Sequence, residues 1–440
     1  MSFEAFELHP RVAAGVEALG YVAPTPIQRA SIPHILRGRD VLGLAQTGTG
    51  KTAAFALPIL QRLSRGPARK VRALVVAPTR ELAEQIHQSF GALGGGTRVR
   101  STTVYGGVGV NPQVERLRAG VEIVVACPGR LLDHIGQRTI DLSGVEVLVL
   151  DEADRMFDMG FLPDIRRLLK HLPAERQTLL FSATMPSDVR HLADEVLRDP
   201  VTVQVDPVAP AATVDHSLYP VPHHLKTPLL LNLLERTEAG SVLVFTRTKH
   251  RAKRVAEQLE RAGHGATCLQ GNLSQNRRQA ALDGFRDGTF QILVATDIAA
   301  RGIDVSSVSH VVNYDMPDTV DAYTHRIGRT GRAARTGDAF TFVTREDDDM
   351  VRAIEKALGA RVERRTVPGF DYSVAAPKRD LEFARPPRQP RAAPKAAAPK
   401  GERSHASQAP RPNGATPAAP RAPLSAGRRF QPRTARARPR

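Results

Sequence analysis

The stretch Gly43–Phe55 reads GLAQTGTGKTAAF and follows two apolar residues. A strand that breaks into glycines and then enters a helix is the usual cradle for nucleotide phosphates, because loop and helix N–H groups point at the anion. The motif has Ala45 where the general pattern has glycine. Lys51 is expected to neutralise the β and γ phosphates, and Thr52 to hold Mg²⁺. The loop is expected to contact the nucleotide through Ala45, Gln46, Thr47, Gly48, Thr49, Gly50, Lys51 and Thr52.

Three carboxylates follow the strand-like run Val147–Leu150, at Asp151, Glu152 and Asp154. Carboxyl ends of neighbouring parallel strands share one edge of a sheet, so these side chains can reach a metal held beside the phosphate loop. We assign Asp151 to Mg²⁺, partly through water, and Glu152 to positioning or deprotonating the attacking water. The two patterns together predict a site that binds and hydrolyses a nucleoside triphosphate.

Short apolar runs alternate with longer amphipathic stretches, which indicates parallel sheets with helices on both faces. The alternation starts again after Pro207, so we predict α/β domains at 1–206 and 214–370, joined by a linker at 207–213. The second domain opens a strand into FTRTKH, without a GKT motif. The predicted strands are Val41–Ala45, Ala73–Ala77, Ile123–Ala126, Val145–Leu150, Thr178–Phe181, Val242–Phe245, Ala266–Leu269, Ile292–Ala295, His310–Tyr314 and Ala339–Val343, and the predicted helices include Arg80–Phe90 and His250–Ala262.

The chain has 440 residues and a formal net charge of +17, which favours a polyanionic partner, either nucleic acid or an anionic surface. The segment 376–440 holds 16 basic and 3 acidic residues, a net charge of +13. It is rich in Pro and Ala and has few residues that could form a core, so we predict a disordered basic tail that tethers RNA. Keeping the protein soluble, or contacting another protein, is the alternative role for the tail.

Cysteine usage and the N-terminus indicate a cytoplasmic protein. The 2 cysteines are too few for a disulfide framework or a cysteine-based zinc site. The start MSFEAFELHP lacks the apolar segment of a secretory signal, and no apolar run is long enough for a membrane helix. The pair His223-His224 is interpreted as part of a loop rather than a metal site, so no zinc and no membrane partner are expected.

Asp151–Asp154 spells DEAD, and with the motifs around it the chain resembles the DEAD-box ATP-dependent RNA helicases. The resemblance runs from about Phe3 to Val343 and implies two tandem RecA-like domains that bind ATP, Mg²⁺ and RNA. The short core and basic tail are most similar to bacterial members of the RhlE type. Ribosomal or RNA-decay assemblies are the partners that this resemblance suggests.

The resemblance gives roles to further residues of the first domain. GYVAPTPIQ (Gly20–Gln28) is similar to the family's adenine-reading motif, with Phe3 at the expected distance before it. Gln28 would then read the adenine edge, and Phe3 would stack on the base. SAT (Ser182–Thr184) is expected to couple the nucleotide site to domain closure together with Asp154, with Ser182 and Thr184 as the coupling residues.

The segment HRIGRTGR (His325–Arg332) places three arginines at spacings of three, on one face of a helix, where they repel one another unless an anion is present. By resemblance, Arg329 and Arg332 reach the γ-phosphate as arginine fingers, and His325 and Arg326 link to the DEAD carboxylates. VATDIAARGIDV (Val294–Val305) resembles a family motif that implies a ribose contact for Asp304 and a place near the closed interface for Asp297.

The resemblance also implies an RNA track that recognises the backbone and 2′-OH groups with little sequence preference. Two positions depart from the family: Cys127 stands where Thr is usual, and Gln270 stands where His is common. Cys127 is either an RNA-track position with a lost hydroxyl or a small buried filler. The RNA-binding residues are expected to be Pro78, Arg80, Gly107, Arg130, Arg247, Gly271 and Thr296.

The sequence therefore predicts a helicase that unwinds or remodels RNA duplexes and RNA–protein complexes. A double-stranded DNA translocase shares the fold, but the Gln28 motif and DEAD argue against it. An ATP-timed RNA clamp or annealing chaperone shares every motif, so this alternative stays open.

Overall fold

The computed structural model describes residues 2–46, 48–205, 214–237, 240–300, 308–331 and 337–376, except the side chain of Ile298. All of these residues belong to one compact unit. Several predicted features lie outside the described residues: Thr47, Asp304, Arg332, the linker 207–213 and the tail from residue 377 onward.

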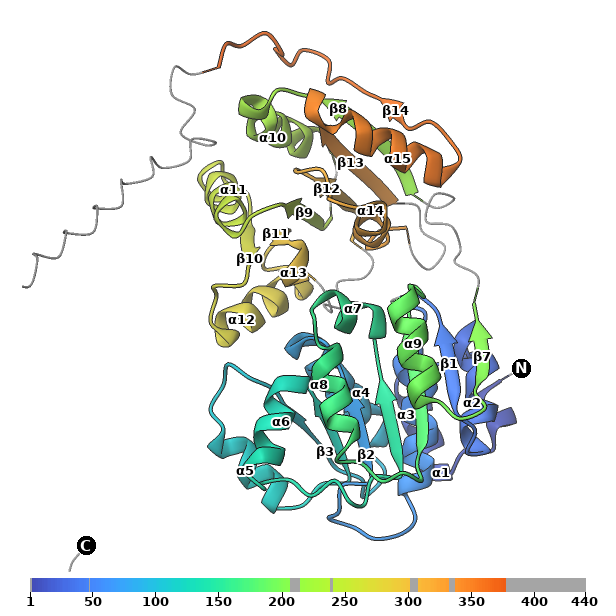
Figure 1. Cartoon of the computed structure of the whole chain (residues 1–440). Coiled ribbons are helices and arrows are strands. Elements are labelled where there is room, and N and C mark those ends of the chain that lie inside the picture. Colours follow the sequence, from blue (N-terminus) through green and yellow to red (C-terminus); the bar gives the residue numbers. More distant parts are fainter. Residues whose placement is uncertain are drawn as a thin grey trace, which may run out of the picture. The chain divides into compact units, whose positions relative to one another are not determined.

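Two parallel sheets of seven strands each form the basis of the fold, one in the first lobe (2–205) and one in the second lobe (214–376) (Figure 1). The strand orders are β3-β4-β2-β5-β6-β1-β7 and β10-β11-β9-β12-β13-β8-β14, so the sheets match strand for strand. This confirms the predicted tandem RecA-like α/β architecture, whereas the domain boundaries stay a prediction. The strands are β1 (Val41–Leu44), β2 (Ala73–Val76), β3 (Ser101–Val104), β4 (Ile123–Ala126), β5 (Val147–Leu150), β6 (Gln177–Ser182), β7 (Val201–Gln204), β8 (Val214–Pro220), β9 (Val242–Thr246), β10 (Ala266–Leu269), β11 (Ile292–Thr296), β12 (His310–Asn313), β13 (Gly337–Val343) and β14 (Glu363–Arg364).

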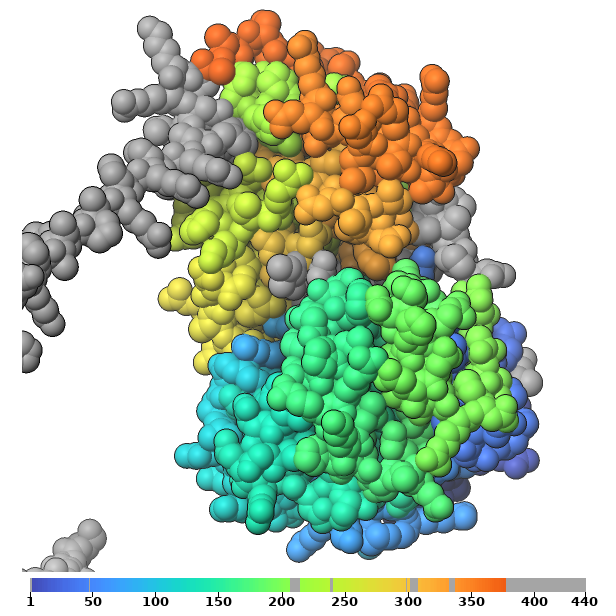
Figure 2. All heavy atoms as spheres, in the orientation of Figure 1, coloured from blue at the N-terminus to red at the C-terminus, as the bar shows by residue number. Residues whose placement is uncertain are grey.

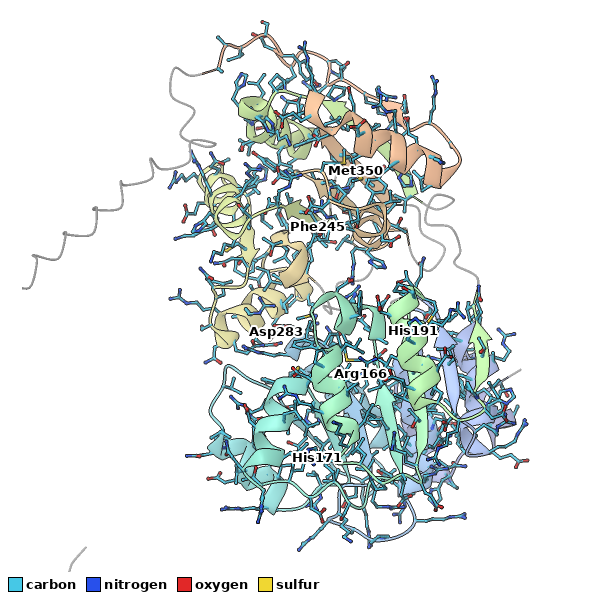
Figure 3. All side chains as sticks on the ribbon, viewed as in Figure 1. Arg166, His171, His191, Phe245, Asp283 and Met350 are labelled. Carbon is cyan, nitrogen blue, oxygen red and sulfur yellow. The ribbon has the colours of Figure 1, made fainter. Side chains whose placement is uncertain are left out.

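Helices cover both faces of the first sheet. One face packs on η1 (Phe3–Phe6), α1 (Pro10–Ala18), α2 (Pro26–Leu36), α3 (Lys51–Leu63) and α4 (Arg80–Gly94). The other face packs on α6 (Pro128–Gly136), α7 (Ala153–Asp158), α8 (Leu162–Leu169) and α9 (Ser187–Val196), with α5 (Asn111–Arg118) contributing at its edge. Side chains of α7, α8 and α9 hide most of this sheet in the space-filling view (Figure 2). Their outer surface is polar: Arg166 of α8, labelled in Figure 3, donates to Glu195 of α9 over 3.0 Å.

The second sheet is covered in the same way. One face packs on α10 (Lys226–Arg236) and α11 (Lys249–Arg261). The other face packs on α12 (Gln275–Arg286), α13 (Asp297–Ala300), α14 (Val320–Ile327) and α15 (Asp348–Leu358). Short 3₁₀ turns complete the lobe at η3 (His223–Leu225) and η4 (Arg345–Asp347). No helix in the described part of the chain is long and apolar enough to cross a membrane.

The sheet topology corrects one comparison between the two halves. The FTRTKH segment follows β9, and β9 occupies the position of β2, so its counterpart is the PTRE segment and not the phosphate loop. The strand that matches β1 is β8, which was not predicted. The true counterpart of the phosphate loop is therefore Val221–Leu225, which leads to Lys226 at the start of α10.

Gly43, within the phosphate-loop stretch, has a packing role in the sheet. It pairs in register with Phe181 of β6, and a Cβ atom on Gly43 would lie 2.4 Å from the Phe181 ring. That ring packs on Phe55 of α3 at a centroid distance of 5.6 Å, and Phe55 in turn packs on Phe90. Gly43 thus leaves the space in which an aromatic cluster joins the sheet to α3 and α4.

Gly43→Ala is expected to lower the free energy of unfolding by about 1–3 kcal/mol, because the added methyl group overpacks this contact. Gly91→Ala is the matched control, since Gly91 lies in α4 with open space around it, and it should raise stability by up to about 1 kcal/mol. Urea unfolding followed by circular dichroism measures both changes. Equal effects of the two substitutions would contradict the packing role of Gly43.

Candidate functional site

The phosphate loop has the backbone that the motif requires. Gly48 and Gly50 have φ angles of 84° and 93°, a region that side chains other than glycine rarely adopt. Lys51 is the first residue of α3, and its Nζ donates to the carbonyl of Ala45 over 2.9 Å. Thr49 Oγ1 donates to the carbonyl of Gln46 over 2.7 Å. The loop is therefore ordered by its own hydrogen bonds, with the lysine held inside it.

Gln28 joins the predicted adenine motif to the phosphate loop. Its Oε1 accepts from the Thr25 N–H over 3.0 Å, and its Nε2 donates to the Gly50 carbonyl over 3.1 Å. A side-chain amide has two N–H donors and two acceptor lone pairs, so one of each remains. This pair matches the N7 acceptor and N6 donor of adenine.

The ring that is exposed for base stacking is Tyr21 and not Phe3, the residue that the sequence predicted. Phe3 is buried, packed edge-on against Phe6, and stacked with Tyr21 at a centroid distance of 6.2 Å. Tyr21 is 41% exposed. Of these two rings, Tyr21 has the face available to a nucleotide base, and Phe3 supports it from below. The aromatic residue inside GYVAPTPIQ was the sequence signal for Tyr21.

Asp151 lies at the end of β5 and is 2% exposed. Burial raises its pKa to about 6, Lys51 opposes this, and the neighbouring Glu152 adds to it. A buried carboxylate beside other carboxylates fits a divalent cation, and Mg²⁺ usually takes one or two protein ligands plus phosphate oxygens and water. The Thr52 hydroxyl at the start of α3 is the other protein ligand that the sequence predicts. Within the described ranges, no group of three or more His, Cys, Asp or Glu side chains forms a separate metal site.

Glu152 adopts a strained backbone that aims its side chain. Its φ of 54° is left-handed, which costs about 1–3 kcal/mol for a residue with a Cβ. Its carboxylate forms a buried ion pair with Arg155, with Oε2 and Nη1 3.1 Å apart. The sequence analysis did not predict this role of Arg155. The i, i+3 spacing of Glu152 and Arg155, which allows an ion pair on a helix, was the available signal.

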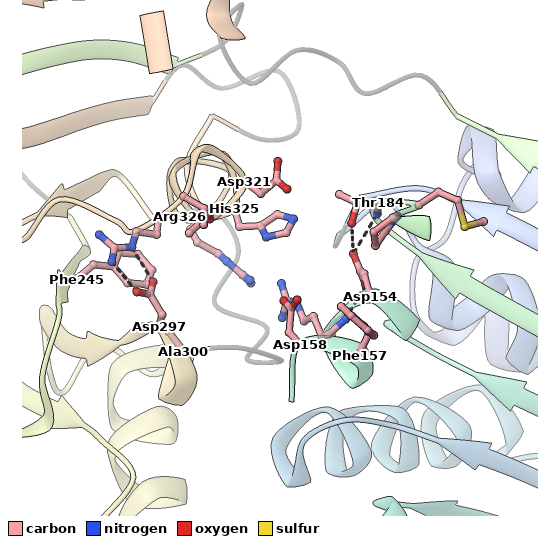
Figure 4. A pocket seen from close by; sticks show the side chains of 16 residues that line it. Asp154, Phe157, Asp158, Thr184, Phe245, Asp297, Ala300, Asp321, His325 and Arg326 are labelled. Atoms are coloured by element: carbon pink, nitrogen blue, oxygen red, sulfur yellow. Dashed lines mark hydrogen bonds and ion pairs between the residues drawn. The ribbon is translucent and has the colours of Figure 1, made fainter. Parts of the chain in front are cut away.

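Asp154 connects the DEAD segment to SAT by four hydrogen bonds. Its Oδ2 accepts from the Ala183 N–H, the Thr184 N–H and the Thr184 hydroxyl at 3.0–3.2 Å, and its own N–H donates to Ser182 Oγ. Ser182 Oγ in turn donates to the Thr184 carbonyl. Figure 4 shows Thr184 above Asp154, with the contacts between these two residues dashed. These bonds join the segment after β5 to the segment after β6, whereas the coupling role of Asp154, Ser182 and Thr184 stays a prediction.

A cavity of about 500 Å³ brings Asp154 and Thr184 together with residues of the predicted arginine-finger segment. His325 points into it from α14 (Figure 4), and burial, helped by the charge of Arg155, lowers the pKa of His325. Arg329 also lines this cavity and is buried. His325 and Asp154 thus line the same cavity, whereas the predicted link of His325 to the DEAD carboxylates stays a prediction.

Arg326 does not reach the DEAD carboxylates, which corrects the expected role. Its Nε and Nη2 pair with the two carboxylate oxygens of Asp297, each over 2.6 Å. Nη1 donates to Asn313 and to the Asp315 carbonyl, and the guanidinium lies 5.1 Å from the centre of the Phe245 ring. These bonds use four of the five N–H donors of Arg326, so its side chain braces the second lobe.

Comparison with known proteins gives the family. Residues 25–192 match the DEAD/DEAH box helicase model, and residues 225–334 match the helicase conserved C-terminal domain. The DEAD-box ATP-dependent RNA helicase CshA of Bacillus licheniformis is 41% identical over 375 residues, covering 85% of this chain and 77% of that protein. CshA of Geobacillus kaustophilus is 42% identical over 379 residues, covering 86% and 81%. The chain belongs to the DEAD-box ATP-dependent RNA helicases. It is accordingly an RNA-dependent ATPase.

Solved structures agree with this family. S. cerevisiae Dbp5 bound to RNA and ADP BeF3 aligns with a TM-score of 0.75 and 32% identity, over 83% of this chain and 95% of that chain. The bacterial relatives carry the names CshA and DeaD. The RhlE-type grouping stays a prediction.

Arg80 and Gly107 of the helicase are in direct contact on the predicted RNA track. Gly107 has a φ of 80°, and a Cβ atom there would lie 2.1 Å from Arg80 Nη1. Arg130 donates to the Val108 carbonyl over 3.2 Å, beside the same turn. Pro78 is buried next to Thr79, which caps α4. These first-lobe residues therefore lie around one glycine turn.

The second-lobe residues of the predicted track lie at strand ends or in the following turns. Thr296 ends β11 and pairs in register with Thr246 of β9, which precedes Arg247. Gly271 is exposed. Gln270 uses its Oε1 to accept the Asn272 N–H over 2.7 Å, so its amide orders the turn around Gly271.

An ion pair between the lobes was not predicted. Arg278 Nε lies 2.7 Å from Glu81 Oε1, and Gln275 Nε2 donates to the same oxygen over 3.3 Å. Arg80 donates to Gln275 Oε1. Arg278 follows the predicted RNA contact Gly271 by seven residues, and nothing in the sequence pairs it with Glu81. The structure gives this residue an intramolecular partner.

Cys127 stands at the N-cap of α6 but makes no side-chain cap hydrogen bond. Threonines at the same position of α4, α11 and α14 all cap their helices: Thr79, Thr248 and Thr319. Burial raises the pKa of Cys127 to about 12, so its thiol is not reactive. The departure from the family therefore leaves the start of α6 without a side-chain cap.

Cys127→Thr is expected to raise the free energy of unfolding by about 1 kcal/mol, because the hydroxyl can accept the Arg130 N–H. Cys127→Val is the matched control, since it has the same shape without the hydroxyl. Urea unfolding of both variants tests this, and a gain shared equally by valine would rule out capping as its cause.

Proposed function

We propose that this helicase uses ATP to close its two lobes on the RNA backbone and to separate short duplexes locally. The observation that carries the proposal is the Asp154 network, because it ties the segment with the catalytic carboxylates to SAT at a cavity that His325 also lines. A nucleotide bound at the phosphate loop would therefore act on a segment in contact with both lobes. Dbp5, which has the same fold, is known bound to RNA and ADP BeF3.

Adenine recognition is assigned to Gln28 and Tyr21. The remaining donor and acceptor of Gln28 would pair with N7 and N6 of adenine, and Tyr21 would stack on the base. Gly48, Gly50 and the start of α3 would bind phosphate oxygens through N–H groups. The ribose contact of Asp304 is proposed from the family resemblance, as is the loop contact of Thr47.

Hydrolysis is assigned to Glu152 as the base. Its carboxylate would accept a proton from water as the water oxygen attacks the γ-phosphorus and the bond to the β–γ bridging oxygen breaks. Lys51, Arg329 and Arg332 would stabilise the charge on the phosphoryl oxygens, with an arginine finger worth about 10³–10⁵ in turnover. Mg²⁺, held by Thr52 and Asp151 partly through water, would supply charge neutralisation between the phosphates.

RNA contacts are assigned to the track around Arg80, Gly107 and Arg130 in the first lobe and Arg247, Gly271 and Thr296 in the second. The tail would tether flanking RNA through its charge. A cytoplasmic location, with ribosomal or RNA-decay assemblies as partners, is part of the proposal on the sequence grounds given above.

Tyr21→Ala is expected to weaken binding of a fluorescent ADP by roughly 5- to 100-fold, because loss of base stacking costs about 1–3 kcal/mol. Tyr21→Phe keeps the ring and should bind within about twofold of the unmodified protein. Equal losses for the two variants would show that the ring does not stack on the base.

Glu152→Gln is expected to lower ATP turnover by about 10²–10⁴ while ATP binding is kept, because the amide fills the same space but accepts no proton. Glu195→Gln, an exposed paired carboxylate on α9, is the control.

The same variants are compared in strand displacement on short RNA and DNA duplexes. Displacement of RNA duplexes that depends on ATP supports the proposed function, whereas RNA-stimulated ATPase without displacement would identify a clamp or annealing chaperone.

A further inference from the structure

The second lobe contains a counterpart of the nucleotide site. Since β8 takes the place of β1, Lys226 and Thr227 begin α10 as Lys51 and Thr52 begin α3. The sequence pair Lys-Thr thus recurs at the same place in both lobes.

The buried aspartate of the ATP site also has a counterpart. β12 takes the place of β5, and Asp315 follows it. The Asp315 N–H donates to the Phe245 carbonyl of β9 over 3.2 Å, as the Asp151 N–H donates to the Val76 carbonyl of β2 over 3.0 Å. Asp315 and Asp151 therefore donate to equivalent carbonyls, with Asp315 one residue further beyond the end of its strand.

Side chains of the protein fill this second site. Lys226 Nζ lies 3.6 Å from Asp315 Oδ1 and donates to the Tyr314 carbonyl over 2.9 Å. Arg251 Nη1 donates to the same Asp315 oxygen over 2.6 Å. The Thr227 hydroxyl lies 2.8 Å from the Tyr314 hydroxyl. The loop before Lys226 reads VPHHL and has no glycine, so it lacks the freedom to wrap a phosphate.

The pKa of the aspartate shifts in opposite directions in the two lobes. In the first lobe, burial raises the pKa of Asp151 to about 6. In the second lobe, burial of Asp315 is outweighed by the Arg251 hydrogen bond and by the charges of Lys226 and Arg251, so the pKa of Asp315 is lowered. Lys226 takes the place of Lys51, and Arg251 adds a second protein cation beside Asp315.

This filled site adjoins Arg247, a predicted RNA contact. The second carboxylate oxygen of Asp315 accepts the Arg247 N–H over 2.9 Å, and Arg247 Nη2 donates to the Met316 carbonyl over 3.2 Å. The Arg247 side chain is 52% exposed. The Asp315 carbonyl accepts from Arg326, which lies under His325. Asp315 thus bonds both to the RNA-track turn and to the segment of the arginine fingers.

We propose that Lys226, Asp315 and Arg251 are positioning residues: they form a self-filled copy of the nucleotide site that fixes the turn after β9 and so orients Arg247 toward RNA. This inference rests on the proposed RNA role of Arg247. A buried ion pair that only stabilised the lobe would not act through Arg247, which makes the two explanations separable.

The test compares binding of a single-stranded RNA to the full chain by fluorescence anisotropy for Asp315→Asn, Arg247→Ala and the double variant. Asp315→Asn should weaken RNA binding about tenfold, as expected for losing a hydrogen bond to a charged group. KM for RNA should rise similarly, with kcat at saturating RNA changed less than about twofold. In the Arg247→Ala background, Asp315→Asn should cause no further loss. Asp338→Asn, which removes a paired carboxylate at the other end of the sheet, is the matched control.

Lys226→Met provides a second variant with the same expected direction if Asp315→Asn does not fold. An additive loss in the double variant, or unchanged RNA binding by Asp315→Asn and Lys226→Met, would overturn the inference while leaving the RNA role of Arg247 intact. Unchanged RNA binding by Arg247→Ala itself would instead overturn that proposed role, and this inference with it.

Discussion

A carboxylate buried at the end of a central strand stays ionised only where cations meet its charge. Both sheets have an aspartate near the end of a central strand. The two lobes differ in how the charge of this aspartate is balanced. Asp315 is satisfied inside the fold by Lys226 and Arg251. Asp151 has Lys51 and other carboxylates nearby, and burial raises its pKa. The first site therefore gains from an incoming cation, whereas the second is complete without one.

Parallel pairing explains why so many side chains depend on this edge. Every strand of a parallel sheet ends on the same side, so the loops after neighbouring strands converge there. Asp154 follows β5 and Thr184 follows β6, and their hydrogen bonds link the segments that follow the two strands. A left-handed residue at Glu152 is retained beside this network, as is common where backbone strain serves a site. The strands thus fix the positions of the loops, and the residues of the site lie in the short segments after the strands.

Much of the fold and the ATP site could be predicted because central strands are buried on both faces and therefore form unbroken apolar runs. The strands β3, β7, β8 and β14 were not predicted: STTV and VDHSLYP contain polar residues, and β7 is partly exposed at a sheet edge. The role of Phe3 could not be predicted from spacing, because burial under Tyr21 is a property of packing. Arg326 was likewise misassigned because its partner Asp297 lies 29 residues away in sequence.

The unequal use of two equivalent sites has a mechanical consequence in the proposed cycle. A ligand shifts a two-state equilibrium only by its difference in affinity for the two states. If both lobes bound their own nucleotide, hydrolysis at one site would leave the other still favouring closure. With the second site filled by Lys226 and Arg251, closure would depend on one γ-phosphate at the first site, to which the second lobe contributes Arg329. Breaking the bond between the β- and γ-phosphates would then remove the whole preference of the nucleotide for the closed state. A single hydrolysis event would therefore be sufficient to release the RNA.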